Sequence, residues 1–545
     1  MRIPLTLIWL CFLLQAVFYC LEQPIWEGLD EWAHFAYVQN LFEQGRIPAP
    51  GDDTSVEVAQ SLHYLPLPYQ PGGRIPSELT HDQYWGLPAA ERAAREAGLR
   101  QIPAAERRET GGAGLYEAQQ APLYYLLVAP VYGAFRHASL AARLLAIRVA
   151  SVLIASLLIP LIYANAKELF GSSRMAMLLA CLAASLPGLL MDVSRAGNES
   201  LAVVLGAAMT LVLIRAIRHG AGLREWLALG FILGLGLLTK AYFLAFLPTI
   251  PVLGLLLALR SRAWKKQIIG AASALLVAVA MGAAWYARME RLTGSLSGEK
   301  NAAAIAQQGL GQKLAAAAHI NWLHIIYEQV YSQIWLGGWT FLRVRPWMYG
   351  VFEVLALFCA VGLVRYAIHR VKRRRITPMS FVLAMLLLLL ILFEPGLFYQ
   401  ALAVYMITHE AFGPGWYFYV LLAPELLLLV AGAWALLGRR GAGRLVAAGC
   451  LFALALNLYT MHLLLLPYYT GLIAHAANGA FRAAHIGVLS DEIRLAQILR
   501  SPFVSARIIS PVIFTISWVA YVLGAVIPAL LALRISYFSR KARHN

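Results

Sequence analysis

The chain has 545 residues, of which 60% are hydrophobic and only 13% are charged, and its mean hydropathy of +0.64 excludes an ordinary soluble domain. This composition predicts an all-α polytopic membrane protein. The net charge of +17 would suit a nucleic-acid partner, but the basic residues lie in short clusters between apolar runs, which indicates membrane topology and no nucleic acid.

Hydrophobic runs long enough to cross a bilayer recur along the chain and predict a bundle of about twelve transmembrane helices. The first covers residues 1–21, helices 2 to 7 lie within residues 144–288, and helices 8 to 12 lie within residues 347–545. The first run has no small-residue cleavage site before Cys20, so we expect a retained helix. All five cysteines lie in or beside hydrophobic runs, which predicts neither disulfides nor a cysteine metal site.

Basic residues mark one side of the predicted bundle. They cluster at residues 215–224, 260–266, 370–375, 439–444 and 534–543. These clusters fall on the same side when the spans alternate, and the positive-inside rule makes that side cytoplasmic. We therefore expect a multi-pass protein of the inner (plasma) membrane, with both termini cytoplasmic and its site on the external, periplasmic face.

Three external segments, residues 22–143, 289–346 and 468–510, are then long enough to build a site outside the lipid. In the first, residues 88–109 are rich in Ala, Glu and Arg and predict a small water-soluble helix, whereas residues 126–135 are apolar but short, which predicts an interfacial or re-entrant piece. The sequence has no glycine-rich phosphate loop or nucleotide fingerprint. We therefore expect an activated substrate to come from the membrane itself.

A polar stretch, Gly28 to Pro48, follows the first span and carries Asp30 and Glu31. If it is helical, His34 falls on one stripe with Asp30, while Trp32 can sit in the membrane interface. We expect a polar cluster on a membrane-surface helix at the water boundary. Such carboxylates and a histidine can bind a divalent cation, take a proton from a hydroxyl, or simply cap the helix.

A second group of ionisable residues lies in short turns between apolar runs. Asp192 and Arg195 sit at membrane depth, where ionisable groups are costly and tend to be functional. Asn198 and Glu199 follow in the same turn, and Glu199 is open to interpretation as a helix cap. Lys240, near the external boundary, is either a snorkelling lysine or a ligand for a lipid phosphate.

Aromatic residues accompany the remaining external charges. Arg343 and Arg345 lie among aromatic residues just before a span, so they are either an interfacial anchor or a binding site for an anionic headgroup. Trp416 and Tyr417 follow an external turn at the start of the tenth span. If Arg343 and Arg345 bind a headgroup, the tryptophans beside these two arginines would stack on sugar rings.

Several short motifs together resemble the GT-C glycosyltransferases, multispan enzymes that include protein O-mannosyltransferases, lipid A aminoarabinose transferases and oligosaccharyltransferases. The first is the external Asp-Glu-x-x-His helix that starts at Asp30 and ends in Gly-x-Ile-Pro48. It is followed by Pro-Leu-Tyr-Tyr-Leu-Leu from Pro122 and by Ala-Arg-Leu144 before the second span. The Leu-Thr-Lys240 segment and a Gly-Gly-Trp-Thr-Phe loop look similar to a bacterial branch of this superfamily.

The resemblance implies a GT-C-like bundle with interfacial helices in its large external loops, and it implies roles for particular residues. The catalytic residues implied are Asp30, Glu31 and Asp192. The substrate-binding and phosphate-binding residues implied are His34, Arg195, Asn198, Lys240, Arg343, Arg345, Trp416 and Tyr417. A divalent cation, Mg²⁺ or Mn²⁺, would be held by Asp30 and Asp192. One departure is that relatives often carry Gly-Arg-Tyr where this chain has Gly-Trp416-Tyr417, so an arginine expected near the donor phosphate is missing.

The function implied is the transfer of a hexosyl or pentosyl group from a polyprenyl-phosphate carrier in the membrane lipid to an acceptor, which can be a protein, a lipid or a polysaccharide. The phosphate is already a leaving group, so only a base and cations are needed. The alternatives are a surface-polysaccharide ligase or polymerase, and a lipid-linked sugar transporter or flippase. Transporters place ionisable residues at mid-membrane in related halves, whereas here they gather at the external face. The early Asp-Glu helix argues against the ligase.

Overall fold

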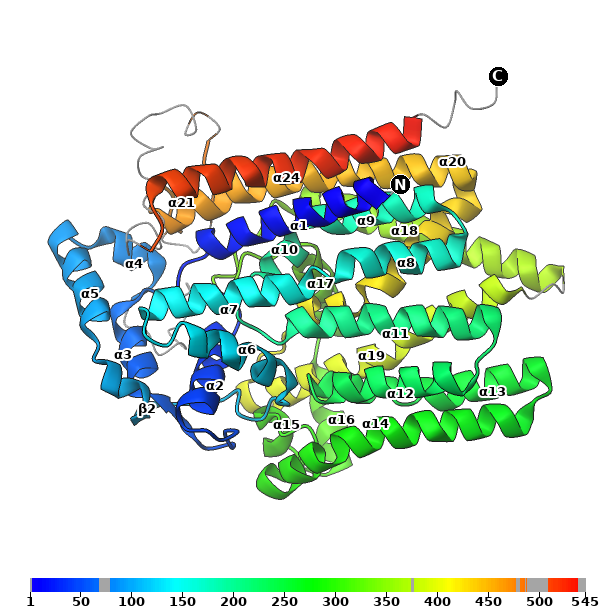
Figure 1. Ribbon diagram of the computed structural model, residues 1–545, viewed down its shortest axis with the longest axis horizontal. Helices are drawn as coiled ribbons and strands as arrows, with labels where there is room; N and C mark the ends of the chain where they lie inside the picture. Colours follow the sequence, from blue (N-terminus) through cyan, green and yellow to red (C-terminus); the bar gives the residue numbers. More distant parts are fainter. Residues whose placement is uncertain are drawn as a thin grey trace.

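A computed structural model describes the chain at residues 2–67, 79–373, 377–476, 481–485, 487 and 508–537. It is a bundle of helices lying side by side, with a small two-stranded sheet near one end (Figure 1). Nine described stretches of helix are long and apolar enough to cross a membrane, or ten if a pair bent by 62° is one span. The predicted all-α polytopic membrane fold is therefore confirmed.

The stretches that meet this test come from all parts of the described chain. They are α1 (Arg2–Glu22), α7 with α8 (Leu140–Ala155, Leu158–Phe170), α11 (Glu199–His219), η2 with α13 (Ala241–Phe246, Thr249–Ser261), α14 (Trp264–Thr293), α18 (Pro346–Lys372), α19 (Pro378–Thr408), the continuous run η3, α20, η4 and α21 (Gly415–Leu421, Leu422–Tyr459, Thr460–Leu465, Leu466–Tyr469), and α24 (Pro511–Tyr537). The bent pair is α9 (Ser173–Ser185) and α10 (Pro187–Val193).

The number of spans that meet the test is smaller than the twelve expected, for two physical reasons. Helix α12 (Leu223–Leu237) has only 15 residues, fewer than the roughly 20 that cross a bilayer upright. Helix α20 is kinked at Gly438, where φ is 68° and ψ is 174°. This non-helical backbone separates two helices within Leu422–Tyr459, which correspond to two of the expected spans, although the whole run meets the test as one stretch.

The two ends of the bundle differ. Helix α1 begins and α24 ends at the same end, where the basic turns after α11 and between α13 and α14 also lie (Figure 1). The opposite end carries a cap formed by the segment between α1 and α7. This arrangement matches the alternation predicted from the basic clusters.

The cap contains five helices and both strands. They are α2 (Glu31–Glu43), α3 (Val56–Tyr64), α4 (His81–Gly86), α5 (Ala89–Gln101), α6 (Leu123–Ala134), the 3₁₀ turn η1 (Ala104–Arg107), β1 (Asp53–Ser55) and β2 (Thr110–Gly114). Strands β1 and β2 pair antiparallel. Helix α5 has no buried residue and matches the predicted water-soluble helix. Helix α6 has 12 residues, about 18 Å, too short to span.

Helix α2 does not lie on the membrane surface, so that expectation was wrong. Every residue from Glu31 to Asn40 is buried. Trp32, expected in the interface, packs instead edge-on against Tyr116, with ring centroids 4.9 Å apart. The cover comes from β1, which follows soon after α2, and from residues more than seventy positions later, among which α6 packs directly on α2. Glu31 at the start of α2 is therefore inside the protein, whereas Asp30 is half-buried.

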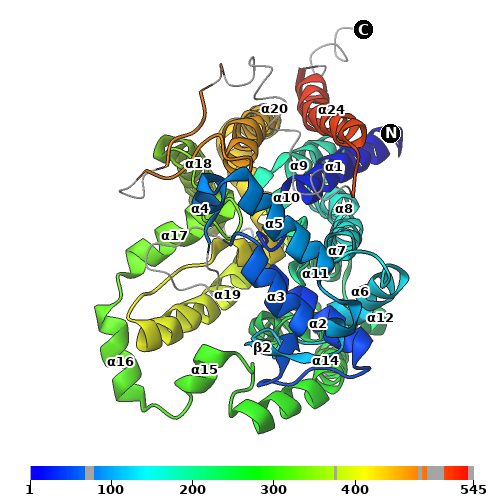
Figure 2. The ribbon, with the colours of Figure 1, turned by 90° about the vertical axis from the view of Figure 1, so that its left-hand side faces the viewer.

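The second external segment lies beside the cap and contains α15 (Lys300–Ala304), α16 (Leu310–His319) and α17 (Trp322–Ile334) (Figure 2). Helix α17 packs against η3, the turn that carries Trp416 and Tyr417. Most of the third expected external segment, 468–510, lies outside the described residues.

Candidate functional site

Charged side chains from distant segments meet at the inner side of the cap. Arg195 lies at the centre: its Nη2 is 2.9 Å from Asp192 Oδ1 and 3.0 Å from Glu199 Oε2. Its Nη1 donates a hydrogen bond to the carbonyl of Leu29 at 2.7 Å, which ties the loop between α10 and α11 to the residue before Asp30. Lys240, from the loop after α12, forms an ion pair with Glu199. Three segments, far apart in the sequence, thus form one charged cluster.

Two glycines make room for Arg195. A Cβ atom on Gly28 would lie 2.6 Å from the Cβ of Arg195, and a Cβ on Gly197 would lie 2.6 Å from its Nη1. Both distances are too short for real side chains, so any larger residue would displace the guanidinium. The spacings of three and four residues that separate Arg195 from Asp192 and Glu199 place all three on one side of the turn.

Asp30 has an unusual backbone for a non-glycine residue. Its φ of 57° and ψ of 15° are left-handed, and its side chain makes no capping hydrogen bond to α2. This conformation costs roughly 1–2 kcal/mol for most residues but is tolerated best by Asp and Asn. Tyr116 donates a hydrogen bond of 2.6 Å to Asp30 Oδ1. Burial raises the pKa of Asp30, against the opposing effects of Tyr116, Arg195 and Lys240.

Glu117 was not predicted from the sequence. It is only 7% exposed, and its Oε2 has no hydrogen-bond partner. Burial, reinforced by the charge of Asp30, raises the pKa of Glu117 to about 8, while Lys240 opposes the shift. The neighbouring Tyr116 also has a raised pKa, because of burial and then because of Asp30. A sequence signal for this pair was its position a few residues before the Pro-Leu-Tyr-Tyr-Leu-Leu motif that begins at Pro122.

Aromatic rings surround the ammonium of Lys240. The ring of Tyr417 lies 4.4 Å from Nζ and that of Tyr242 lies 5.5 Å from it, distances at which cation–π attraction operates. Burial, and then the charge of Arg195, lowers the pKa of Lys240 to about 7. Asn198 donates hydrogen bonds to Gln120 Oε1 and to the carbonyl of Thr239, so it positions the loops on either side of the cluster.

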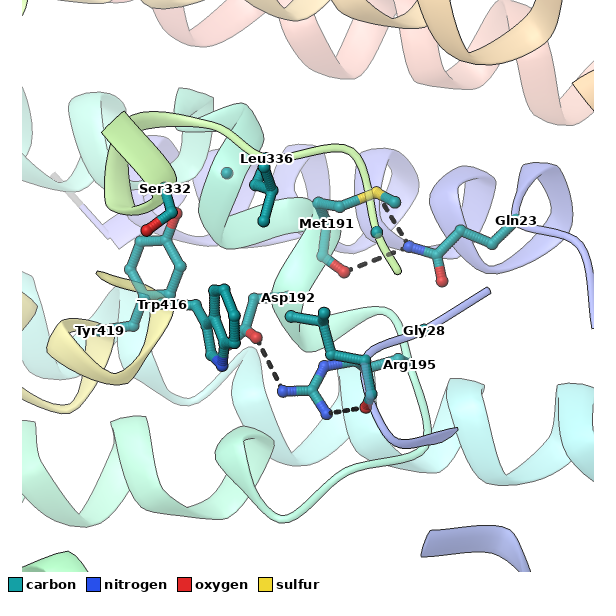
Figure 3. Close-up of a pocket in the computed structure, with 12 residues that line it drawn as sticks. Gln23, Gly28, Met191, Asp192, Arg195, Ser332, Leu336, Trp416 and Tyr419 are labelled. Atoms are coloured by element: carbon teal, nitrogen blue, oxygen red, sulfur yellow. Dashed lines mark hydrogen bonds and ion pairs between the residues drawn. The ribbon is translucent and has the colours of Figure 1, made fainter. Parts of the chain in front are cut away.

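A narrow pocket opens beside Arg195 (Figure 3). It is lined by residues of the loop after α1, of α10, of α17 and the loop after it, and of η3, namely Gln23, Gly28, Leu29, Gly188, Met191, Asp192, Arg195, Ser332, Leu336, Gly338, Trp416 and Tyr419. Trp416 lies next to Asp192 in this view. Asp192 Oδ2 and Gln23 Oε1 are buried without a hydrogen-bond partner. Such atoms normally have partners, so the pocket presents free acceptors for hydroxyl or amine groups.

Four predicted site residues lie apart from this cluster. Glu31 accepts hydrogen bonds from Arg148 at 2.7 and 2.5 Å and from the backbone N–H of Ala196 at 3.0 Å. His34 Nδ1 is 2.8 Å from the hydroxyl of Tyr125, and burial lowers the pKa of His34.

The other two are the arginines of the second external segment. The guanidinium of Arg343 lies over the ring of Tyr331, 4.4 Å from its centroid, and Arg345 forms a hydrogen bond with Tyr459. Among the contacts of the described residues, none joins Arg343 or Arg345 to Lys240. The arrangement therefore leaves Lys240 and Arg195 as the cations of the cluster.

The cluster does not fit a divalent cation as it stands. In the described ranges, no three His, Cys, Asp or Glu side chains are placed to hold a metal ion together. Asp192 and Glu199 are bound by Arg195 and Lys240, so cationic side chains already neutralise these carboxylates. Mg²⁺ requires a near-octahedral oxygen shell.

The model of a family described as predicted membrane protein (DUF2142) matches residues 12–396. The chain is similar in structure to ArnT from Cupriavidus metallidurans bound to undecaprenyl phosphate, with 13% identity, a TM-score of 0.46, and coverage of 98% of this chain and 77% of that chain. A search of the curated proteins gave no match.

Two archaeal structures from Archaeoglobus fulgidus are also similar. One is an oligosaccharyltransferase in complex with Zn and sulfate, with 14% identity, a TM-score of 0.41, and coverage of 88% of this chain and 54% of that chain. The other is the oligosaccharyltransferase AglB in complex with an inhibitory peptide and a dolichol-phosphate, with 13% identity, a TM-score of 0.39, and coverage of 97% and 56%. The chain thus spans about half the length of these two proteins. Oligosaccharyltransferases are among the enzymes that the sequence motifs resemble.

Proposed function

This chain belongs to the DUF2142 family of predicted membrane proteins, and we propose that it is a glycosyltransferase that moves a sugar from a polyprenyl-phosphate carrier to an acceptor. The observation that carries the proposal is the charged cluster in which Arg195 and Lys240 lie close enough to Asp30 to oppose the rise of its pKa that burial causes. A carboxylate base and two cations are the groups that this transfer needs. One of these cations, Arg195, lines a pocket with free hydrogen-bond acceptors.

In the proposed reaction, a hydroxyl or amine of the acceptor attacks the anomeric carbon of the donor. A new bond forms to that carbon, its bond to the phosphate oxygen breaks, and the electron pair stays on the phosphate. Asp30 takes the proton of the acceptor; it is partly exposed and burial raises its pKa, both of which favour a base working near neutral pH. Lys240 and Arg195 stabilise the charge that develops on the phosphate.

The ion pair of Lys240 with Glu199 is compatible with this role. An ammonium has three N–H donors, and Glu199 takes one of them, which leaves donors for a phosphate. In this proposal the cap lies on the external face of the inner membrane, because the basic turns at the other end of the bundle belong in the cytoplasm. The sugar then reaches the site on its lipid.

The test is Asp30→Asn, compared with Asp53→Asn, the same change at an exposed position of the cap. Purified variants in proteoliposomes would be given a panel of labelled undecaprenyl-phosphate sugars and membranes from cells lacking the protein as the source of acceptor. We expect Asp30→Asn to reduce transfer by about 10²–10⁴-fold, and Asp53→Asn to leave it unchanged. Mass spectrometry of lipid-linked sugars in cells with and without the protein identifies the donor. Full activity of Asp30→Asn, or no transfer by the unaltered protein with any donor, would refute the proposal.

A further inference from the structure

Charge is not balanced within the buried cluster. Its carboxylates are Asp30, Glu117, Asp192 and Glu199, and its cations are Arg195 and Lys240. Ionised carboxylates that are buried without a cation are costly, and a group in that position binds a proton instead. At least one of these carboxylates is therefore expected to be neutral when no ligand is present.

The contacts identify which carboxylate this is. Asp192 and Glu199 each have a cationic partner, and Asp30 accepts the hydrogen bond of Tyr116. Within the described ranges, Glu117 forms no ion pair, and its Oε2 lacks any hydrogen-bond partner although more than nine-tenths of the residue is buried. Glu117 is nevertheless close enough to Asp30 and Lys240 to interact with both charges.

We propose that Glu117 is a neutral carboxylic acid in the resting protein and donates a hydrogen bond to the phosphate of the lipid donor beside Lys240. This inference rests on the proposed function and adds a phosphate-binding residue to it. A protonated carboxyl offers one O–H donor, whereas an ionised one offers only acceptors and would repel the phosphate. This proposal explains why Oε2 of Glu117 has no hydrogen-bond partner in the structure: its partner is the phosphate of the ligand.

Glu117 keeps its proton when the phosphate leaves. The second ionisation of a phosphate monoester has a pKa of about 6, below the pKa of about 8 to which burial raises Glu117. The phosphate therefore accepts a hydrogen bond from Glu117 and does not take its proton. The titratable and charged groups that face Glu117 are Asp30, Tyr116, Tyr125, Lys240, Glu299 and Tyr417.

The experiment measures the dissociation constant for undecaprenyl phosphate in nanodiscs at about pH 7 and about pH 9. With a pKa of about 8, the protonated fraction of Glu117 falls from about nine-tenths to about one-tenth, so its ionisation alone weakens binding about tenfold. Glu117→Gln keeps a donor that does not titrate, so this tenfold loss disappears in that variant. Lys240 titrates in both proteins, and the difference between them isolates residue 117. The control is Glu109→Gln, the same change at an exposed site, which should behave like the unaltered protein.

Each outcome decides between the two proposals. If Glu117→Gln shows the same pH dependence as the unaltered protein, or binds nothing at pH 7 while folded, the role of Glu117 is refuted and the proposed function stands. If the unaltered protein does not bind undecaprenyl phosphate, both are refuted. If Glu117→Gln does not fold, infrared difference spectra of the unaltered protein between these pH values replace it. The carbonyl band of a protonated carboxyl must then be present at pH 7, decrease at pH 9, and change on binding the lipid phosphate.

Discussion

We expect the two adjacent carboxylates at the start of α2 to have different roles, with Asp30 as the base and Glu31 as a structural residue. Substitution of Glu31 provides the sharpest test of this difference. Glu31 is fully buried and forms a two-pronged ion pair with Arg148, whose side chain is 0% exposed. The same guanidinium donates hydrogen bonds to the carbonyls of Cys20, Gln23 and Pro24, at the end of α1. Arg148 therefore joins the end of α1, the start of α2 and α7.

The expected loss in the free energy of unfolding follows from these contacts. Arg148→Met leaves the carboxylate of Glu31 buried without its cation and leaves three carbonyls without a donor, and breaking such a pair costs about 3–5 kcal/mol. This corresponds to a change of about 10²–10⁴-fold in the folded-to-unfolded ratio. Glu31→Gln keeps the hydrogen bonds from Arg148 to the carbonyls and should cost less. The double variant should be more stable than the sum of the two losses predicts, by about 0.5–3 kcal/mol.

The assay is reversible unfolding in lipid bicelles, combined with the transfer rate at a temperature where all variants are folded. We expect Glu31→Gln to lower the free energy of unfolding while the folded fraction keeps most of its activity. Glu31 also accepts a hydrogen bond from Ala196, next to Arg195, so a small increase in KM is compatible with its positioning role. A folded, stable Glu31→Gln protein without any transfer would refute this reasoning, because Glu31 would then take part in the chemistry.

Three further predictions concern the cluster itself. The hydrogen bond from Tyr116 stabilises ionised Asp30, so Tyr116→Phe raises the pKa of Asp30 and should move the acid limb of the pH–rate profile upward by about one unit; an unchanged limb would show that Asp30 is not the base. Lys240→Met should weaken binding of undecaprenyl phosphate at least about tenfold, whereas Arg343→Met, which removes a cation stacked on a tyrosine, should change it less than threefold; equal effects would place Arg343 in the site. Chelation with EDTA should leave transfer intact, because cationic side chains already bind the carboxylates, and loss of activity restored by Mg²⁺ or Mn²⁺ would contradict this.

The fold was predictable because its signals are local. A run of apolar residues is visible in the sequence, and so is a cluster of basic residues at its end. The break at Gly438 was visible in the same way, because the basic residues at 439–444 separate two apolar runs there. The burial of α2 was missed because the residues that cover it, such as Tyr116 and Tyr125, follow about 80–90 positions later, and nothing in α2 itself indicates them.

The site was predictable only in part. Asp192, Arg195 and Lys240 stood out because ionisable residues at membrane depth are rare, and the structure brings them together. Glu117 did not stand out, because it belongs to a polar loop in which hydropathy offers no contrast. Arg343 resembled a phosphate ligand by its neighbours in sequence, but its partner Tyr331 comes from the preceding helix. Sequence thus predicted which charges were unusual, and only the structure showed their partners.

Adjacent carboxylates at the start of a helix cannot serve the same pocket. Successive helical residues point about 100° apart, and the left-handed backbone of Asp30 turns its side chain further from that of Glu31. Glu31 consequently faces Arg148 and the end of α1, whereas Asp30 faces Tyr116 and the cations of the cluster. The anchored glutamate fixes the start of α2, and a fixed start is what keeps the strained conformation of Asp30 in place. The structural role of one residue is therefore a condition for the proposed chemical role of the other.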